Sequence, residues 1–323
     1  MKFSANSLKK LIKGACNFEI SAGYLTPRKF APAQFDLMKR EGYDDFWRER
    51  ALLSAGIRLE VKTDSTRISF DYKGQWGTDL SLRSNSVDVW INGTLSTVLH
   101  LEKSKGSVKI DLPNGEKHIA IYFPNDSEFS IKNFTLDGSY KSVKDKGQKV
   151  LVIGDSITQG YGPAFSSGSY FNTLQRMTGY NMLNQGIGGY RCEPIDLIPV
   201  EGFVPDKVMT FLGTNWYDAP NVYDYEKATV EFYSRLTELY HDKQILCVSP
   251  IWRCDDSLDK ERFDWCREIV KRECQKYENI TLVDGFSLLP NIEECLCDKV
   301  HPNEYGCYMI AKNLYNKMKE IKF

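Results

Sequence analysis

The chain has 323 residues, of which 42% are hydrophobic and 26% are charged, and its formal net charge is −1. These proportions are typical of a folded globular protein, and at roughly 100–200 residues per domain the length favours two domains. A near-neutral charge without a basic stripe gives no electrostatic basis for nucleic-acid binding, so we expect no nucleic-acid partner.

The N-terminal residues do not have the pattern of a secretion signal. Lys9, Lys10 and Lys13 interrupt the apolar positions there, whereas a signal peptide needs about 7–15 consecutive apolar residues. No run approaches the ~20 apolar residues of a membrane span, so we expect no membrane partner. The chain has 9 cysteines, an odd number, and most follow residue 190, which favours free thiols. Together these features predict a cytoplasmic protein.

Residues 1–145 have the periodicity of β structure. Apolar and polar residues alternate in four runs, at 57–61, 68–72, 87–91 and 119–123. A period of two with one apolar face indicates half-buried antiparallel strands. Asn92-Gly93 and Asn114-Gly115 lie between such runs, where a hairpin turn requires positive φ. We therefore predict an N-terminal β-sandwich, jelly-roll-like domain. Trp47, Trp76 and Trp90 could stack on sugar rings there, although tryptophan in β structure is more often part of the core.

The polar stretch at 139–148 is a plausible linker, and the pattern changes after it. Short apolar runs alternate with amphipathic stretches of helical period, which predicts an α/β domain over 146–323 with a parallel sheet between two helical layers. Ligands of such sheets bind beyond the carboxyl ends of the strands. The predicted strands include 149–154, 182–186, 207–213, 245–251 and 280–285, and the predicted helices include 168–178, 223–242, 257–278 and 302–321.

Residues suited to acyl transfer follow the predicted strands. Ser156 needs an adjacent base to become a nucleophile, and His301, whose ordinary pKa lies near working pH, suits that role. Asp298, three residues earlier, could orient the imidazole. The backbone N–H groups of Ser156 and Gly189 and the side-chain amide of Asn215 could form an oxyanion hole. We expect these segments to meet at one edge of the sheet.

In these segments the sequence resembles the SGNH (GDSL-like) hydrolases. The family's blocks correspond to GDSITQG (154–160), NQGIGG (184–189), GTN (213–215) and DKVH (298–301). The resemblance covers residues 149–323 and implies a three-layer α/β/α fold, with Ser156 as nucleophile, Gly189 and Asn215 as oxyanion donors, and Asp298 and His301 completing a triad.

One block departs from the family pattern. The third block is usually GxND, but here Trp216 follows the asparagine and could line the substrate pocket. Further candidate substrate contacts follow the glycine block or the fourth predicted strand of the α/β region, and for the arginines a surface salt bridge is the alternative. These candidates are Asp155, Tyr190, Arg191, Trp252 and Arg253.

A β-rich domain ahead of an SGNH domain resembles carbohydrate esterase family two, whose members deacetylate sugars. The resemblance implies a serine esterase that acts on short acyl esters, mainly acetyl esters, of a small-molecule or oligosaccharide substrate. Two alternatives remain open. The same triad could serve an O-acetyltransferase, or the chain could be a carbohydrate-binding protein with a vestigial esterase site.

The same residues allow other interpretations. Asp155 or Ser156 could cap a helix, and His301 before Pro302 could mark a helix start. Cys295, Cys297, His301 and Cys307 form a cluster, but C-x-C with one histidine fits structural zinc spacing poorly, so we predict no metal. The sequence has no Gly-rich phosphate loop of the Walker or dinucleotide type, and we predict no cofactor.

Overall fold

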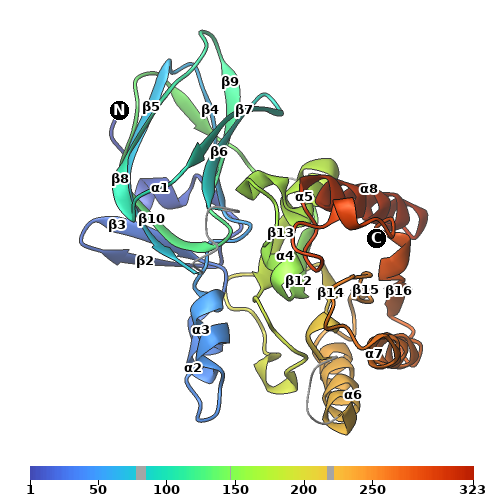
Figure 1. Ribbon diagram of the computed structural model, residues 1–323. Coiled ribbons are helices and arrows are strands. Elements are labelled where there is room, and N and C mark those ends of the chain that lie inside the picture. The colour runs from blue at the N-terminus through green and yellow to red at the C-terminus, as the bar shows by residue number, and fades with distance from the viewer. Residues whose placement is uncertain (78–84, 146, 217–221) are drawn as a thin grey trace.

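The computed structural model describes residues 1–77, 85–145, 147–216 and 222–323. Figure 1 shows an antiparallel β region beside an α/β region, with the N-terminus in the first and the C-terminus in the second. Two antiparallel sheets build the first region, and one parallel sheet lies in the second. The predicted fold class is confirmed.

The β region is a sandwich of two sheets. One sheet has the order β1-β4-β9-β6-β7 with β11 beside β4, and the other has the order β2-β3-β10-β5-β8. Alternating side chains of both sheets, such as Leu59 and Ile121 from one and Ile68 and Phe129 from the other, form a single buried core. The strands are β1 (Ile12–Lys13), β2 (Asn17–Ser21), β3 (Tyr24–Arg28), β4 (Arg58–Thr63), β5 (Arg67–Trp76), β6 (Ser86–Ile91), β7 (Thr94–His100), β8 (Lys105–Asp111), β9 (Lys117–Tyr122), β10 (Ser127–Leu136) and β11 (Tyr140–Ser142).

The two predicted turns differ in the structure. Asn92 (φ 51°) and Gly93 (φ 81°) join β6 to its antiparallel neighbour β7, so this hairpin prediction is confirmed. Gly115 also has positive φ (86°), but it connects β8 in one sheet to β9 in the other. The hairpin prediction at Asn114-Gly115 is therefore wrong, because a turn signal does not specify which sheet the next strand joins.

The predicted linker is partly structured, because Tyr140–Ser142 form β11 and pair with β4. The predicted domain boundary after residue 145 falls between β11 and β12. The described part of the N-terminal region also holds three helices that were not predicted from the sequence, α1 (Ala5–Lys9), α2 (Pro32–Leu37) and α3 (Asp45–Ala51).

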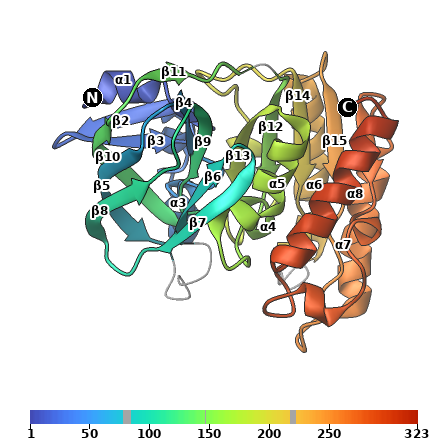
Figure 2. The ribbon, with the colours of Figure 1, turned by 90° about the horizontal axis from the view of Figure 1, so that it is seen from above.

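The C-terminal sheet is parallel, with the order β13-β12-β14-β15-β16. Both faces are covered (Figure 2). Alternate residues of β12 separate the two cores: Val150 and Val152 pack with α5 and α8, and Leu151 and Ile153 pack with α6 and α7. The strands are β12 (Lys149–Gly154), β13 (Asn181–Gly186), β14 (Lys207–Phe211), β15 (Gln244–Val248) and β16 (Ile280–Val283), and the helices are α4 (Ser156–Gln159), α5 (Tyr170–Thr178), α6 (Val222–Leu239), α7 (Lys260–Cys274) and α8 (Glu304–Glu320).

The short helices α2 and α3 join the two regions. Ala31 and Phe30 at the start of α2, and Trp47 and Ala51 of α3, are buried in the same core as Leu151. The N-terminal region therefore extends to the sheet that carries the candidate site. All nine cysteines lie in described parts of the chain, and none of them is in a disulfide bond. Within the described residues, no helix is long and apolar enough to cross a membrane.

Candidate active site

Ser156 lies at the first position of α4, directly after β12. Asp155 precedes it in an extended conformation, and its side chain accepts a hydrogen bond from the backbone N–H of Ile157 at 3.0 Å. Asp155 is thus the N-cap, and Ser156 follows it, so the capping interpretation and the nucleophile interpretation are compatible. Gly186 permits this arrangement, because a Cβ there would lie 2.3 Å from the backbone nitrogen of Gln159.

His301 connects Ser156 to Asp298. Its Nε2 lies 2.8 Å from Ser156 Oγ, and its Nδ1 lies 2.8 Å from Asp298 Oδ2. A tight turn with Lys299 at φ 67° brings the carboxylate and the imidazole together. The other carboxylate oxygen, Oδ1, accepts hydrogen bonds from the backbone N–H groups of Val300 (3.1 Å) and His301 (2.7 Å). The three side chains form a continuous hydrogen-bonded chain. In it, the imidazole can accept the proton of Ser156 while the carboxylate orients the ring.

The electrostatics of Asp298 favour its ionised form. Burial raises the pKa of this carboxyl, but the hydrogen bond and charge of His301 and the two backbone donors outweigh burial and lower the pKa to about 2. Asp298 is therefore ionised throughout the neutral range and can stabilise a protonated His301. The ring of Tyr161 packs edge-on against the imidazole, with ring centroids 4.7 Å apart.

The two predicted oxyanion donors lie beside the nucleophile. Gly189, with φ 74°, and Asn215 line the same pocket as Ser156 and His301. Nδ2 of Asn215 donates to the carbonyl of Tyr190 at 3.0 Å. An amide nitrogen carries two hydrogens, so this bond fixes the side chain and leaves one hydrogen for an oxyanion.

Arg191 and Arg253 bind backbone carbonyls of the loop that carries Asn215. Arg191 Nε donates to the carbonyl of Asn215 at 3.1 Å, and one terminal nitrogen of Arg253 lies 3.4 Å from the carbonyl of Thr214. Arg253 also pairs with Asp255, and 7% of its side chain is exposed. The described residues that line the pocket include neither arginine. Both arginines thus bond to backbone carbonyls of this loop, and Arg253 also forms a largely buried ion pair with Asp255.

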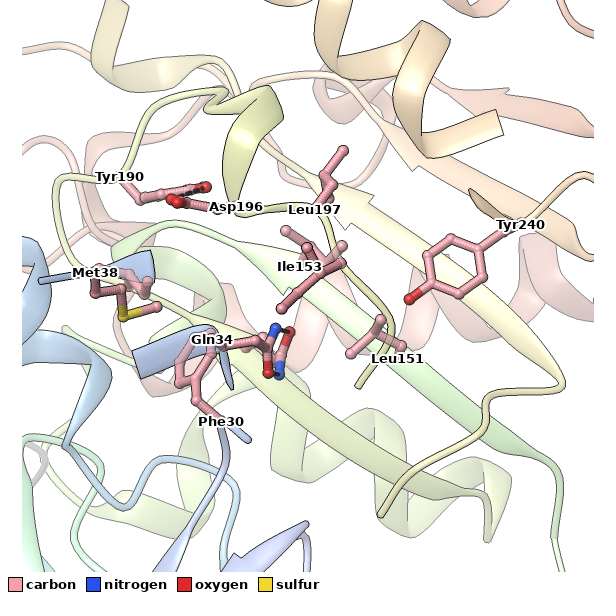
Figure 3. Close-up of a pocket in the computed structure, with 12 residues that line it drawn as sticks. Phe30, Gln34, Met38, Leu151, Ile153, Tyr190, Asp196, Leu197 and Tyr240 are labelled. Carbon is pink, nitrogen blue, oxygen red and sulfur yellow. Dashed lines mark hydrogen bonds between the residues drawn. The ribbon is translucent and has the colours of Figure 1, made fainter. Parts of the chain in front are cut away.

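Three other candidates for substrate contact have side chains within the protein. Asp155 is buried and its side chain caps the N-terminus of α4, and burial raises its pKa to about 7. Tyr190 is buried, and its hydroxyl donates to Asp196 at 2.9 Å (Figure 3). Trp252 is buried in the core between the sheet and α8. These positions put all three away from the pocket lining, because a residue beside a motif can still direct its side chain into the core. The side chain of Trp216 lies outside the described part of the structure.

The pocket has a volume of about 340 Å³, and both regions of the chain contribute to it. The residues that sequence reasoning missed are Phe46 and Arg50 of α3, Asp126 before β10, and Gln159 and Tyr161 beside the nucleophile. Gln159 lies inside the GDSITQG block and could have been considered. The residues from the N-terminal region belong to no motif, so no sequence pattern pointed to them.

Gln159 forms hydrogen bonds with two other residues of the pocket lining. Its Oε1 accepts from the backbone N–H of Gly188 at 2.8 Å, and its Nε2 donates to Asp126 Oδ1 at 3.1 Å. Asp126 belongs to the N-terminal region, so this amide links the β-sandwich to the loop that carries Gly189. Lys29 contributes a second link, because its buried Nζ donates to the carbonyl of Gly186 at 2.6 Å.

A separate cavity lies between α2 and the parallel sheet (Figure 3). Its lining includes Phe30, Gln34 and Ile153, and its volume is about 20 Å³. The amides of Gln34 and Gln185 pair across it. This space holds roughly one water molecule, so it is a packing cavity of the interface and too small for an ester substrate.

The tryptophans considered for sugar stacking have different surroundings. Trp47 is buried and packs edge-on against Tyr190. Trp90 is partly buried, donates to Ser167 Oγ at 2.9 Å and is covered by Arg176 at 4.0 Å. The side chain of Trp76 lies outside the described part. Among described residues, no group of three or more His, Cys, Asp or Glu side chains is placed to hold a metal ion.

Comparisons with known proteins agree with this architecture. Residues 152–307 match the model of the GDSL-like Lipase/Acylhydrolase family. Among curated proteins, no sequence matches the chain. A structure from Bacteroides ovatus described as a GDSL-like lipase covers 100% of this chain and 98% of its own, with 18% identity and a TM-score of 0.81. A family two carbohydrate esterase from Cellvibrio japonicus covers 99% and 97%, with 16% identity and a TM-score of 0.69.

A third structure, the salicylyl-acyltransferase SsfX3 from a tetracycline biosynthetic pathway, covers 96% of this chain and 94% of its own, with 19% identity and a TM-score of 0.78. At these identities the likenesses establish a shared two-region fold. The family match and the fold together show that residues 152–307 form an SGNH domain of the GDSL-like lipase/acylhydrolase family, in a chain whose architecture resembles that of family two carbohydrate esterases.

Proposed function

We propose that this protein is a serine esterase that removes short acyl groups, mainly acetyl, from a carbohydrate or a related small alcohol. The observation that carries the proposal is the pair of 2.8 Å contacts that join Ser156 Oγ to His301 and His301 to Asp298. This is the arrangement that activates a serine hydroxyl for attack on an ester.

In the proposed reaction, His301 accepts the hydroxyl proton as Ser156 Oγ forms a bond with the acyl carbon. The tetrahedral oxyanion is held by the amides of Ser156, Gly189 and Asn215. The ester C–O bond then breaks, His301 returns the proton to the departing alcohol, and an acyl-serine remains. Water, deprotonated by His301, attacks this intermediate, and its collapse releases the carboxylic acid and the free serine.

Two features support a short acyl group on a polar alcohol. The pocket lining contains polar groups such as Gln159 and Asp126, with the rings of Phe46 and Tyr161 as its apolar part. The family two carbohydrate esterases of the same fold act on carbohydrates by their descriptions, and this supports a sugar ester.

The test is hydrolysis of p-nitrophenyl acetate by the wild type and by Ser156→Ala. We expect the wild type to turn over and the variant to lose roughly 10³-fold or more in kcat. A chain-length series from acetate to octanoate should decline with length, and a maximum at the longest ester would rule out the short-chain proposal. An inactive wild type that binds sugars would instead support a binding protein with a vestigial site.

Acyl transfer is the second candidate, because the acyltransferase SsfX3 has the same overall fold. The same acyl-serine would pass its acyl group to an alcohol in place of water. Adding a sugar acceptor to the ester assay separates the two activities. A transferase would form acylated sugar faster than free acid, whereas an esterase would form free acid at the same rate with or without the acceptor.

A further inference from the structure

One wall of the pocket comes from α3. Phe46 and Arg50 lie one turn apart on the same face of this helix, and Cζ of Arg50 lies 4.2 Å from the centroid of the Phe46 ring. This face lies against the loop that carries the proposed oxyanion donor. A Cβ at Gly189 would lie 3.2 Å from Phe46, and a Cβ at Gly188 would lie 3.7 Å from Cγ of Arg50. Both side chains line the pocket that contains Ser156.

Among the described residues, the buried charge of Arg50 has no oxygen partner. Its exposed fraction is 6%, and within the described residues its guanidinium has the Phe46 ring as its contact and neither a hydrogen bond nor an ion pair. Burying a cation is costly unless an anion or a hydrogen-bond acceptor compensates it. The five other described basic residues that are at least as deeply buried all have such partners: Arg28 has Glu19 and Glu128, Lys29 the Gly186 carbonyl, Arg58 Glu60, Lys117 the Ser65 carbonyl, and Arg267 Asp284.

The two carboxylates among the described residues of the same pocket already have partners. Asp298 accepts from His301 and two backbone N–H groups. Asp126 accepts from Gln159 and interacts electrostatically with the buried Lys29. The positive charge of Arg50 is thus left to act on whatever occupies the pocket.

We propose that Arg50 is an anion-binding, specificity-determining residue, so that the preferred ester carries a carboxylate or a similar anionic oxygen group. This inference rests on the proposed esterase function. A guanidinium binds a carboxylate through two parallel N–H donors, and the Phe46 ring below it holds its plane in place. The anionic group belongs either to the alcohol, as in an acetylated uronic acid, or to the acyl group, as in a succinyl ester.

Two matched pairs of esters test both sources. Acetylated glucuronate and acetylated glucose differ in a carboxylate on the alcohol, and p-nitrophenyl hemisuccinate and p-nitrophenyl butyrate differ in a carboxylate on the acyl chain. In one of the two pairs, we expect the wild type to have a kcat/KM for the anionic ester well above that for the neutral ester. We expect Arg50→Gln to lower this ratio about 10- to 100-fold, because the variant loses a hydrogen bond to a charged group. Arg50→Lys should retain part of the preference, because it keeps the charge without the planar fork.

Arg48→Gln is the matched control. Arg48 lies on the same helix, pairs with Asp45 and has 41% of its side chain exposed. We therefore expect this variant to keep the wild-type ratio of kcat/KM for the anionic and neutral esters. The pair that shows the preference identifies the part of the substrate that carries the anion. Equal kcat/KM values within both pairs, or a ratio unaffected by Arg50→Gln, would overturn the proposal.

Binding separates this inference from the proposed function. Calorimetry with the Ser156→Ala variant measures the affinity for glucuronate, glucose, succinate and butanol without any turnover. An anion preference that disappears when Arg50→Gln is added supports the subsite even if no ester is hydrolysed. Equal affinities in the presence and absence of Arg50 contradict it, whatever the esterase assay shows.

Discussion

Replacing Asp298 by asparagine tests the role of the carboxylate in the proposed triad. In the wild type, Oδ1 accepts two backbone N–H groups at 3.1 and 2.7 Å, and Oδ2 faces His301 Nδ1. An asparagine has one acceptor oxygen. The backbone donors fix that oxygen at the Oδ1 position, so the NH₂ group must take the place of Oδ2 and point at Nδ1.

This substitution changes the tautomer of His301. A donor facing Nδ1 requires an unprotonated Nδ1, so the proton of the neutral ring moves to Nε2, which can then no longer accept the proton of Ser156 Oγ. The imidazolium also loses its counter-charge. We expect kcat to fall by roughly 10³- to 10⁴-fold, as observed for a triad aspartate replaced in the same way in a serine protease, with little change in KM.

The comparison with Asp298→Ala makes the test specific. Alanine removes the counter-charge but imposes no donor on Nδ1, so water can enter and the productive tautomer remains accessible. We therefore expect Asp298→Asn to be at least as impaired as Asp298→Ala in p-nitrophenyl acetate hydrolysis. An asparagine variant that stays within tenfold of the wild type, or is clearly more active than the alanine variant, would refute the tautomer argument.

Three further predictions concern groups around the site. Burial raises the pKa of Asp155 from 3.8 to about 7. Between pH 4 and 7 the folded protein therefore keeps a proton on Asp155 that the unfolded chain releases, and the free energy of unfolding falls as pH rises through this range. Asp155→Asn keeps the cap and should lack this fall, which melting temperatures at pH 5 and 8 will show relative to the wild type. Burial lowers the pKa of Lys29 from 10.5 to about 7, although the charge of Asp126 acts in the opposite direction. Between pH 7 and 10.5 the Lys29 amine is therefore protonated in the unfolded chain and largely neutral in the folded protein, so the free energy of unfolding rises with pH. Between pH 7 and 9 the unfolding free energy of the wild type should rise by about 2 kcal/mol more than that of Lys29→Met in urea titrations; parallel curves would contradict this. Gln159→Ala releases the Gly188 amide and should lower kcat/KM by roughly 10- to 100-fold through misplacement of the oxyanion loop, whereas unchanged kinetics would show that the loop is held by other contacts.

Where a motif and a strand end coincided, the sequence predicted which residues lie together in the structure. The short apolar runs before Ser156, Gly189 and Asn215 alternate with helical segments, which predicts strands of a parallel sheet, and parallel strands present their carboxyl ends at one edge. The geometry of Asp298 and His301 followed from a spacing of three residues, which one tight turn can close.

The remaining parts of the site depend on tertiary contacts that no local pattern encodes. Helix α3 has seven residues, too few for a helical period to be recognised. Its position over Gly188 and Gly189 depends on how the two regions pack. The same limit explains why Arg191 and Arg253, although close to the motifs, bind backbone carbonyls of the Asn215 loop, because a sequence does not show which way a long side chain points.

The most direct test of the account is to trap the acyl intermediate. The protein is mixed with p-nitrophenyl acetate, quenched in acid within the first turnovers and digested, and the acetylated peptide is identified by mass spectrometry. We expect one acetyl group on Ser156 in the wild type and none at that position in Ser156→Ala, with the label removed as hydrolysis proceeds. Turnover without any labelled serine, or a label on another residue that the Ser156→Ala variant still acquires, would contradict the assignment of Ser156 as the nucleophile.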